Sequence, residues 1–180
     1  AKVAEAGLAA GAELINDVSG IGEDAMVQLA KGSEADFVAM HHTALPADPS
    51  DRIPPEADPV AVVRDWFNTR QSLWEAKGLD HDRIILDPGI GFGKAPAQSW
   101  QLLRNIPALA DLGHRILIGH SRKGFLNAFT GMASATRDPE TIAVSLGLLD
   151  QGASIIRVHD VDGHQRAYKS WRRLRRPPSL

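Results

Sequence analysis

The chain has 180 residues, of which 43% are hydrophobic and 23% charged, with 16 glycines, 11 prolines and no cysteine. This composition is typical of a globular protein, and the length predicts a single domain over residues 1–180. The lack of cysteine excludes a disulfide scaffold, thiol catalysis and cysteine-ligated metal centres, and it fits a protein of the cytoplasm. No apolar run approaches the roughly 18 residues that cross a bilayer, so we expect no membrane association.

The formal net charge is only −2, but the basic residues are unevenly placed. Residues 166–180 contain no acid and hold six basic side chains: Arg166, Lys169, Arg172, Arg173, Arg175 and Arg176. Such a run could bind nucleic acid, but cations at the C-terminal end of a helix are also favoured by the helix dipole. We adopt the second interpretation and expect no nucleic-acid partner.

In chain order, short β-branched runs alternate with longer amphipathic stretches. The chain opens in a helical, alanine-rich stretch without methionine, so we expect it to come from the inside of a longer protein. Pro107 is expected to break or kink one helix, and loops are expected around residues 45–59 and 130–138. Strands are predicted at 13–16, 37–40, 84–86, 116–119 and 155–158, and later helices at 24–31, 60–77, 97–112, 139–151 and 163–174.

Five strands that are each followed by a helix predict an α/β fold with a parallel sheet and right-handed crossovers. Polar residues follow the C-terminal end of every predicted strand, which favours a barrel over an open sheet with a single ligand crevice. A complete (β/α)8 TIM barrel needs about 250 residues. We therefore expect a partial barrel of about five parallel strands.

Two polar clusters have a structural explanation as well as a functional one. Asn16 and Asp17 could cap a turn, because both residue types bond readily to nearby backbone. The glycine-rich loop at 89–94 follows a strand and precedes a helix, as a phosphate cradle would. It lacks the spacing of the common nucleotide-binding motifs, so we do not predict a nucleotide site there.

Histidines and acids at the strand ends could be considered as metal ligands. However, the adjacent His41 and His42 would point to opposite faces of a strand, and no His-x-His or His-Glu-x-x-His spacing occurs. We therefore predict no histidine-based metal site. Ser121 follows His120 but lacks the Gly-x-Ser-x-Gly turn of a nucleophilic serine, so acyl transfer is not expected.

Five motifs cover nearly the whole chain: Ile-Asn-Asp-Val-Ser-Gly at 15–20, Met-His at 40–41, Asp-Pro-Gly-Ile-Gly-Phe-Gly-Lys at 87–94, Ser-Arg-Lys-Gly-Phe at 121–125 and Arg-Val-His-Asp-Val at 157–161. In order and spacing, they resemble the dihydropteroate synthase family. The resemblance implies a (β/α)8 barrel of folate biosynthesis. Its reaction condenses 6-hydroxymethyl-7,8-dihydropterin diphosphate with p-aminobenzoate to give dihydropteroate and pyrophosphate.

The resemblance begins at the family's fourth strand. The first three βα units of the family carry an Asn-x-Thr-Pro-Asp-Ser-Phe loop, a second mobile loop and a pterin-binding Asp, and these motifs are absent here. Family members also use Mg²⁺, whose expected ligand lies in those units, so no metal ligand is assigned in this chain. The resemblance further implies a homodimer and a sulfonamide target, and the segment 41–46 departs from the pattern common in the family.

The resemblance implies a pterin pocket formed by four residues. A carboxylate at Asp87 can accept two parallel hydrogen bonds from the 2-amino group and ring N–H of a pterin. Asn16 offers both a donor and an acceptor to the ring, and Lys123 can donate to it while its stem packs against the substrates. Met40 is expected to line the pocket.

The remaining assignments concern the leaving group and the amine. Arg157 and His159 supply fixed positive charge and donors for the departing diphosphate, so with Lys123 they are the predicted catalytic residues. Ser121 and Phe92, with Lys123 nearby, resemble the p-aminobenzoate pocket.

Three alternatives stay open at this point. A pterin-binding methyltransferase of the related barrel superfamily would share Asn16 and Asp87, although it has no diphosphate to explain Arg157. A chain that binds pterin without catalysis, or a generic barrel piece of another function, is also compatible with the sequence.

Overall fold

The computed structural model describes residues 1–46, 48, 50–127, 131 and 133–175. Its five strands form one parallel sheet in which each strand pairs with the next one in the chain. All five strands predicted from the sequence are confirmed, with bounds that differ by at most two residues. They are β1 (Leu14–Asp17), β2 (Asp36–Met40), β3 (Ile84–Asp87), β4 (Arg115–Ile118) and β5 (Ile155–Ile156).

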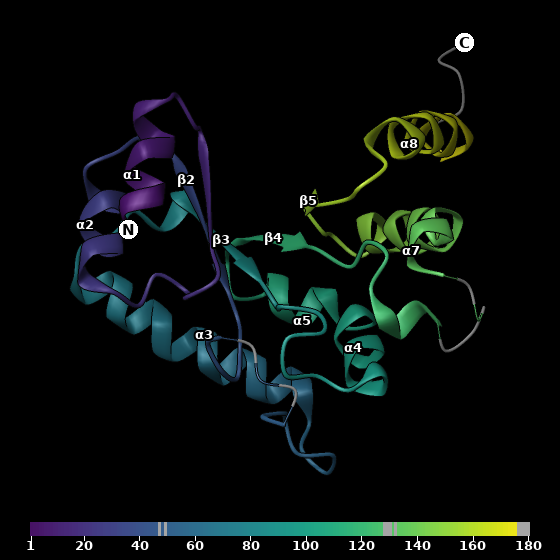
Figure 1. Ribbon diagram of the computed structural model, residues 1–180, viewed down its shortest axis with the longest axis horizontal. Coiled ribbons are helices and arrows are strands. Elements are labelled where there is room, and N and C mark those ends of the chain that lie inside the picture. The colour runs from purple at the N-terminus through teal and green to yellow at the C-terminus, as the bar shows by residue number, and fades with distance from the viewer. Residues whose placement is uncertain (47, 49, 128–130, 132, 176–180) are drawn as a thin grey trace.

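The sheet is curled, with helices on its outer side and β1 and β5 at its two free edges (Figure 1). The described residues thus form the partial barrel that the sequence predicts. The α-helices are α1 (Lys2–Ala9), α2 (Asp24–Lys31), α3 (Pro59–Ala76), α4 (Pro96–Leu103), α5 (Ile106–Ala110), α7 (Asp138–Asp150) and α8 (Val161–Arg175). Single 3-10 turns occupy His81–Arg83, Gly124–Leu126 and Ser134–Thr136.

The helix predicted at 97–112 consists of two helices, because α4 ends at Leu103 and α5 begins at Ile106. Pro107 lies in the first turn of α5, where a missing backbone N–H leaves no helical bond unmade. The expected break is therefore confirmed, but it falls just before the proline.

The basic tail is partly accounted for by α8. Arg172 and Arg175 lie over the rings of Tyr168 and Trp171, and Arg175 also pairs with Asp150 of α7. Arg176 and Thr130, which the sequence analysis placed in the tail and in a loop, lie outside the described residues. Within the described part of the chain, no helix is long and apolar enough to cross a membrane.

Side chains alternate between the two faces of the curled sheet. Phe37, Ala39 and Leu86 face outward into the main core, where they pack with residues from the surrounding helices. Val38, Ile85 and Leu117 form a separate inner cluster, with Ile155 packed against it. The fold therefore has two apolar layers, as expected of a barrel wall.

The inner face also sets the direction of the polar residues at the strand ends. Because side chains alternate with a period of two, Asp87 shares the face of Ile85, and Arg157 shares the face of Ile155. The same rule places Asn16 on the inner face with Leu14, and both residues line one groove with Ile155 and Arg157. Polar residues of β1 and β3, and Arg157 just after β5, thus converge at the carboxyl end of the sheet.

The core assignment predicts a large effect at Leu86, which is fully buried in the central strand. We expect Leu86→Ala to reduce the free energy of unfolding by about 2–5 kcal/mol, because it removes apolar contacts and leaves a cavity. Leu174→Ala is the matched control, since this leucine is 85% exposed and its loss should change stability by about 0.5 kcal/mol or less. Urea denaturation measures both values. Equal losses in the two variants would contradict the assigned core.

Candidate active site

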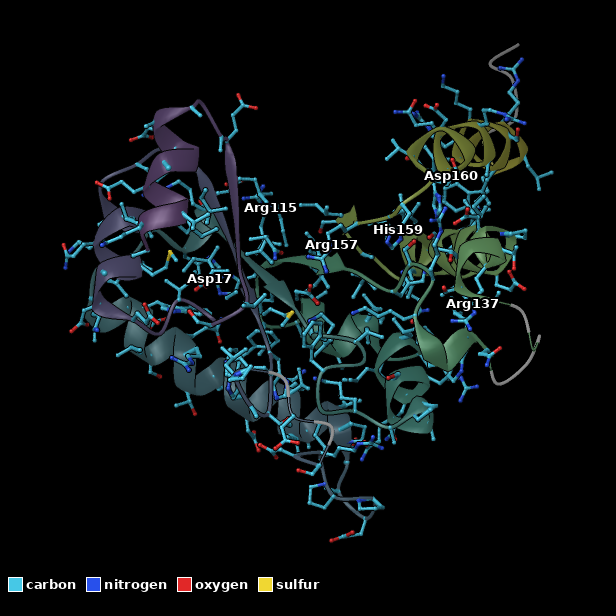
Figure 2. All side chains as sticks on the ribbon, viewed as in Figure 1. Asp17, Arg115, Arg137, Arg157, His159 and Asp160 are labelled. Atoms are coloured by element: carbon cyan, nitrogen blue, oxygen red, sulfur yellow. The ribbon has the colours of Figure 1, made fainter. Side chains whose placement is uncertain are left out.

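Three side chains from widely spaced strands meet at the carboxyl end of the sheet. Arg157, just after β5, donates through Nη1 to Oδ1 of Asn16 on β1 at 3.0 Å. Its Nη2 lies 4.0 Å from Oδ2 of Asp87 at the end of β3. Arg157 and His159 lie close together on the segment that leaves β5 (Figure 2). One arginine thus joins the first and last strands to the central carboxylate.

Asp87 is the most deeply buried acid of this site, with 2% of its side chain exposed. Burial raises the pKa of its carboxyl group, while the Gly89 N–H and the positive charges of Lys123, Arg157 and Lys94 oppose that rise. The Gly89 N–H donates to Oδ1 at 2.7 Å. A carboxylate in this setting is poised to accept hydrogen bonds from a ligand with adjacent N–H donors.

The glycine-rich loop after β3 packs tightly against the end of β2. Gly89 has a φ of +63°, and a Cβ at this position would lie 2.0 Å from the carbonyl oxygen of His41. Glycine is therefore required both for the backbone conformation and for the close approach. The turn closes with a 2.9 Å bond from the Phe92 N–H to the Gly89 carbonyl, and Met40 is adjacent to it. This packing brings Met40 and Phe92 into the site.

Lys123, in the turn after β4, reaches across to the same loop. Its ammonium group donates to the Ile90 carbonyl and lies 4.8 Å from the centre of the Phe92 ring. Burial lowers the pKa of Lys123 to about 8, against the opposing attraction of Asp87. Lys123, Phe92 and Asp87 therefore belong to one cluster.

Ser121 and His159 form a second, adjoining pair. The serine Oγ lies 2.8 Å from Nδ1 of His159 and accepts a bond from the His159 backbone N–H at 3.2 Å. Both residues line a cavity of about 340 Å³ that is also lined by Gly119, Lys123, Arg157 and Val158. An opening of this size, lined by two cations and a histidine, suits an anionic group.

Lys94 belongs to this site as well, although the sequence analysis gave it no role. The side chain is buried, and its Nζ lies 2.8 Å from Nδ1 of His41 and 2.8 Å from the carbonyl of Phe92. Burial lowers the pKa of Lys94 to about 7, and burial also lowers the pKa of His41 to about 3. The neutral His41 ring can therefore accept from the ammonium group. The only sequence signal was a lysine at the end of a glycine-rich motif.

A clamp from the start of α7 holds the turn that carries Ser121 and Lys123. Arg122 has a φ of +58°, and its guanidinium donates two bonds to Asp138, at 2.8 and 2.7 Å. Arg137 donates to the carbonyls of Arg122 and Lys123, and Thr141 accepts from the Arg122 N–H. No local motif could reveal this clamp, because its two halves lie about 15 residues apart.

All eight site residues predicted from the sequence lie at this end of the sheet. The structure brings them together as three contacting groups: Asn16 with Arg157 and Asp87, Lys123 with Phe92, and Ser121 with His159. Met40 is buried beside Gly89. Among the described residues, no group of three or more His, Asp or Glu side chains could hold a metal ion.

Comparison with known proteins identifies the class. A family model described as pterin binding enzyme matches residues 1–159. The dihydropteroate synthase of Anaplasma phagocytophilum, solved with bound 6-hydroxymethylpterin-monophosphate, is 34% identical, with a TM-score of 0.89 over 96% of this chain and 68% of that one. The Xanthomonas albilineans dihydropteroate synthase with 4-aminobenzoic acid is 34% identical, with a TM-score of 0.88 over 98% of this chain and 63% of that one.

The fold and site therefore define a (β/α)8-barrel protein of the pterin-binding class. Within that class, the chain belongs to the dihydropteroate synthase family, which its sequence motifs had indicated. A folate synthesis bifunctional protein of Chlamydia muridarum is 39% identical over 84% of this chain. The chain spans only 34% of that protein, and about two thirds of the solved structures it matches.

Two buried histidines of the site region make the stability of the fold depend on pH. Burial lowers the pKa of His120 to about 4, and that of His41 to about 3, from 6.5. Below pH 6.5 the unfolded chain therefore binds protons that the folded chain does not. The free energy of unfolding is thus highest above pH 6.5 and decreases as the pH falls toward 4. The slope is ~1.4 kcal/mol per pH unit for each histidine.

Urea denaturation between pH 7 and 4 measures this slope. His120→Gln should be less stable than the parent at pH 7, because His120 bonds to the Thr141 carbonyl and to Ser145. It should nevertheless lose stability less steeply between pH 6.5 and 4. A variant with the parent's slope would show that His120 is not held neutral.

Proposed function

We propose that this chain carries the pterin-binding and anion-binding half of a dihydropteroate synthase active site, within one domain spanning residues 1–180. The reaction is the transfer of the dihydropterin-6-ylmethyl group from diphosphate to the amine of p-aminobenzoate. The single observation that carries the proposal is the buried Asp87 carboxylate, with Arg157 4.0 Å away and the positive charge of Lys123 acting on it. This arrangement places a hydrogen-bond acceptor for the pterin ring next to cations that can bind an anion.

Asp87 orients the pterin by accepting from its 2-amino group and ring N–H. Asn16 adds a donor and an acceptor at the ring once its amide is released from Arg157, to which it is bonded at 3.0 Å. Lys123 donates to the ring from the other side, and the buried Met40 gives the pocket an apolar wall. Together these groups fix the reactive methylene at the mouth of the anion cavity.

Arg157 and His159 act on the leaving group. The bond between the pterin methylene carbon and the diphosphate oxygen breaks, and its electron pair leaves with the diphosphate. The amine nitrogen of p-aminobenzoate then bonds to the same carbon and loses a proton. Positive charge placed where the diphosphate charge develops lowers the barrier, and no protein nucleophile is needed.

Ser121 and Phe92 are assigned to the p-aminobenzoate side. Phe92 offers an aromatic face beneath the Lys123 ammonium, and the Ser121 hydroxyl is a small polar group at the edge of the anion cavity. An aryl acid fits between an aromatic ring and a cation, because the ring packs on the face and the carboxylate pairs with the charge. A sulfonamide has a similar shape, so the same pocket would be its target.

Several further assignments rest on the family alone. We keep a homodimer, a cytoplasmic location and Mg²⁺ as predictions. The described residues do not fit a magnesium site, because they offer no cluster of three potential ligands and the anion cavity is lined by cations. No step of the proposed reaction is therefore assigned to the metal.

Pterin binding tests the proposal directly. A pterin diphosphate analogue is titrated into the protein by calorimetry, and Asp87→Asn should weaken binding at least about 100-fold, because the amide keeps the shape but loses the charge and one acceptor. Asp58→Asn, on the exposed N-cap of α3, is the control and should bind as the parent does. Binding that survives Asp87→Asn unchanged would overturn the assignment.

Release of pyrophosphate on addition of p-aminobenzoate separates catalysis from binding alone. Arg157→Ala should lower the rate of release more than it lowers affinity for the pterin ring. Because this chain carries only half of the proposed active site, the assay is run on a longer protein that also supplies the other half. If that protein binds the analogue but releases no pyrophosphate, it is a non-catalytic pterin-binding protein.

A glycine substitution displaces Arg157 without removing its charge. A Cβ at Gly119 would lie 2.5 Å from Nη2 of Arg157, so Gly119→Ala should push the guanidinium away from Asp87 and Asn16. We expect the pterin diphosphate analogue to bind about tenfold more weakly, with a smaller effect on the pterin lacking phosphate. Gly147→Ala, where a Cβ meets nothing, is the control. Equal losses for both ligands would contradict a role of Arg157 toward the anion.

A further inference from the structure

Lys94 is the one buried cation of the site that the proposed reaction does not use. Its side chain is 6% exposed, and its ammonium group bonds to two partners from neighbouring elements, the His41 ring and the Phe92 carbonyl. Burying an ammonium group costs free energy that two hydrogen bonds to neutral partners offset only in part. The negative charge of Asp87 attracts the ammonium group and opposes the loss of its proton.

Among the described residues, Asp87 is the acid whose negative charge attracts the Lys94 ammonium group. His41 and His42, after β2, and Lys123, after β4, are each neutral or positive, and Asp87 at the end of β3 attracts the ammonium group. The segment that carries His41 is packed directly against the end of β3, which carries Asp87. His41 donates its backbone N–H to the Asp87 carbonyl at 2.9 Å, and Gly89 lies directly against His41.

Arg157, Lys123 and Lys94 are the three cations that act on Asp87, and they differ in whether a substrate would contact them. Under the proposed function, Arg157 turns to the diphosphate and Lys123 turns to the pterin ring and p-aminobenzoate. Lys94 is not among the residues that line the anion cavity, and it is tethered to Phe92 and His41. Because its pKa is about 7, Lys94 carries a positive charge at acidic pH, and its two hydrogen bonds hold that charge in place when the other two cations engage ligand.

We propose that Lys94 is a positioning residue whose ammonium group, tethered to His41 and to the Phe92 carbonyl of the glycine-rich loop, keeps Asp87 ionised for pterin binding at acidic pH. The inference rests on the proposed function for its role toward the pterin, while the effect on Asp87 is a property of the unliganded protein. Loss of the positive charge at residue 94 removes an attraction that stabilises the ionised Asp87 carboxylate, so the protonated form is favoured.

Two substitutions separate the charge of Lys94 from its hydrogen bonds. Lys94→Gln keeps a donor for the Phe92 carbonyl but is neutral, whereas Lys94→Arg keeps the positive charge. Lys77→Gln is the matched control, because Lys77, at the C-terminal end of α3, forms a surface ion pair with Asp24. Near-UV circular dichroism establishes that each variant is folded, and Lys94→Met replaces Lys94→Gln as the neutral variant if the latter is not.

The first measurement is the titration of Asp87 in the unliganded protein, followed by carbon-13 NMR of its carboxyl group and assigned with Asp87→Asn. We expect Lys94→Gln to move the midpoint upward by at least about one pH unit, and Lys94→Arg and Lys77→Gln to leave it near the parent value. An unchanged midpoint in Lys94→Gln, or an equal shift in Lys94→Arg, overturns the inference.

The second measurement is the pH dependence of pterin binding, with 6-hydroxymethylpterin as the probe. The acid limb of the binding profile should move to higher pH in Lys94→Gln, with about tenfold weaker binding on that limb, and Lys94→Arg should restore it. If the parent protein binds no pterin at any pH, the proposed function fails, and the titration of Asp87 still decides the electrostatic role of Lys94. Parent-like pterin binding by Lys94→Gln across the acid limb overturns that role.

Discussion

The site depends on one buried negative charge. Asp87 ends the central strand of the sheet with 2% of its side chain exposed, and an isolated carboxylate in that position would be strongly disfavoured. Cations from two other strand ends, together with the Gly89 N–H, make the charge tolerable. The position of Arg157, the path of the glycine-rich loop and the reach of Lys123 all follow from this requirement.

A parallel sheet that curls is well suited to meet such a requirement. Side chains of a single parity in β1, β3 and β5 face the same interior, and the carboxyl ends of the strands lie at one edge. The loops that leave those ends then act as supports. The clamp between Arg122 and Asp138 fixes the turn after β4, and the close approach of Gly89 to His41 fixes the turn after β3.

The proposed roles divide the cations by their freedom to move. Arg157 contacts the side chains of Asn16 and Asp87, and its own side chain is 44% exposed, so a ligand can compete for it. Lys94 is bonded to a backbone carbonyl and to a neutral histidine ring, so its position is held, and in the proposed role it is the charge that does not move. A site that binds a pterin and releases an anion needs both kinds, because one charge must persist while another is redirected.

The sequence by itself predicted the five strands and the barrel class, because alternating apolar runs and polar strand ends are local patterns, and the structure confirms both. The roles of the eight site residues came from the resemblance of five motifs to a known family, and they stay predictions. The sequence also predicted the helix break near Pro107 from the missing N–H of proline. Only the tertiary structure decided how those residues meet, such as the contact of Arg157 with Asn16, 141 positions earlier. Lys94 and Arg137 were missed for the same reason: His41 is brought to Lys94, and the turn at 122–123 to Arg137, by packing between separate elements, and no spacing in the sequence encodes those contacts.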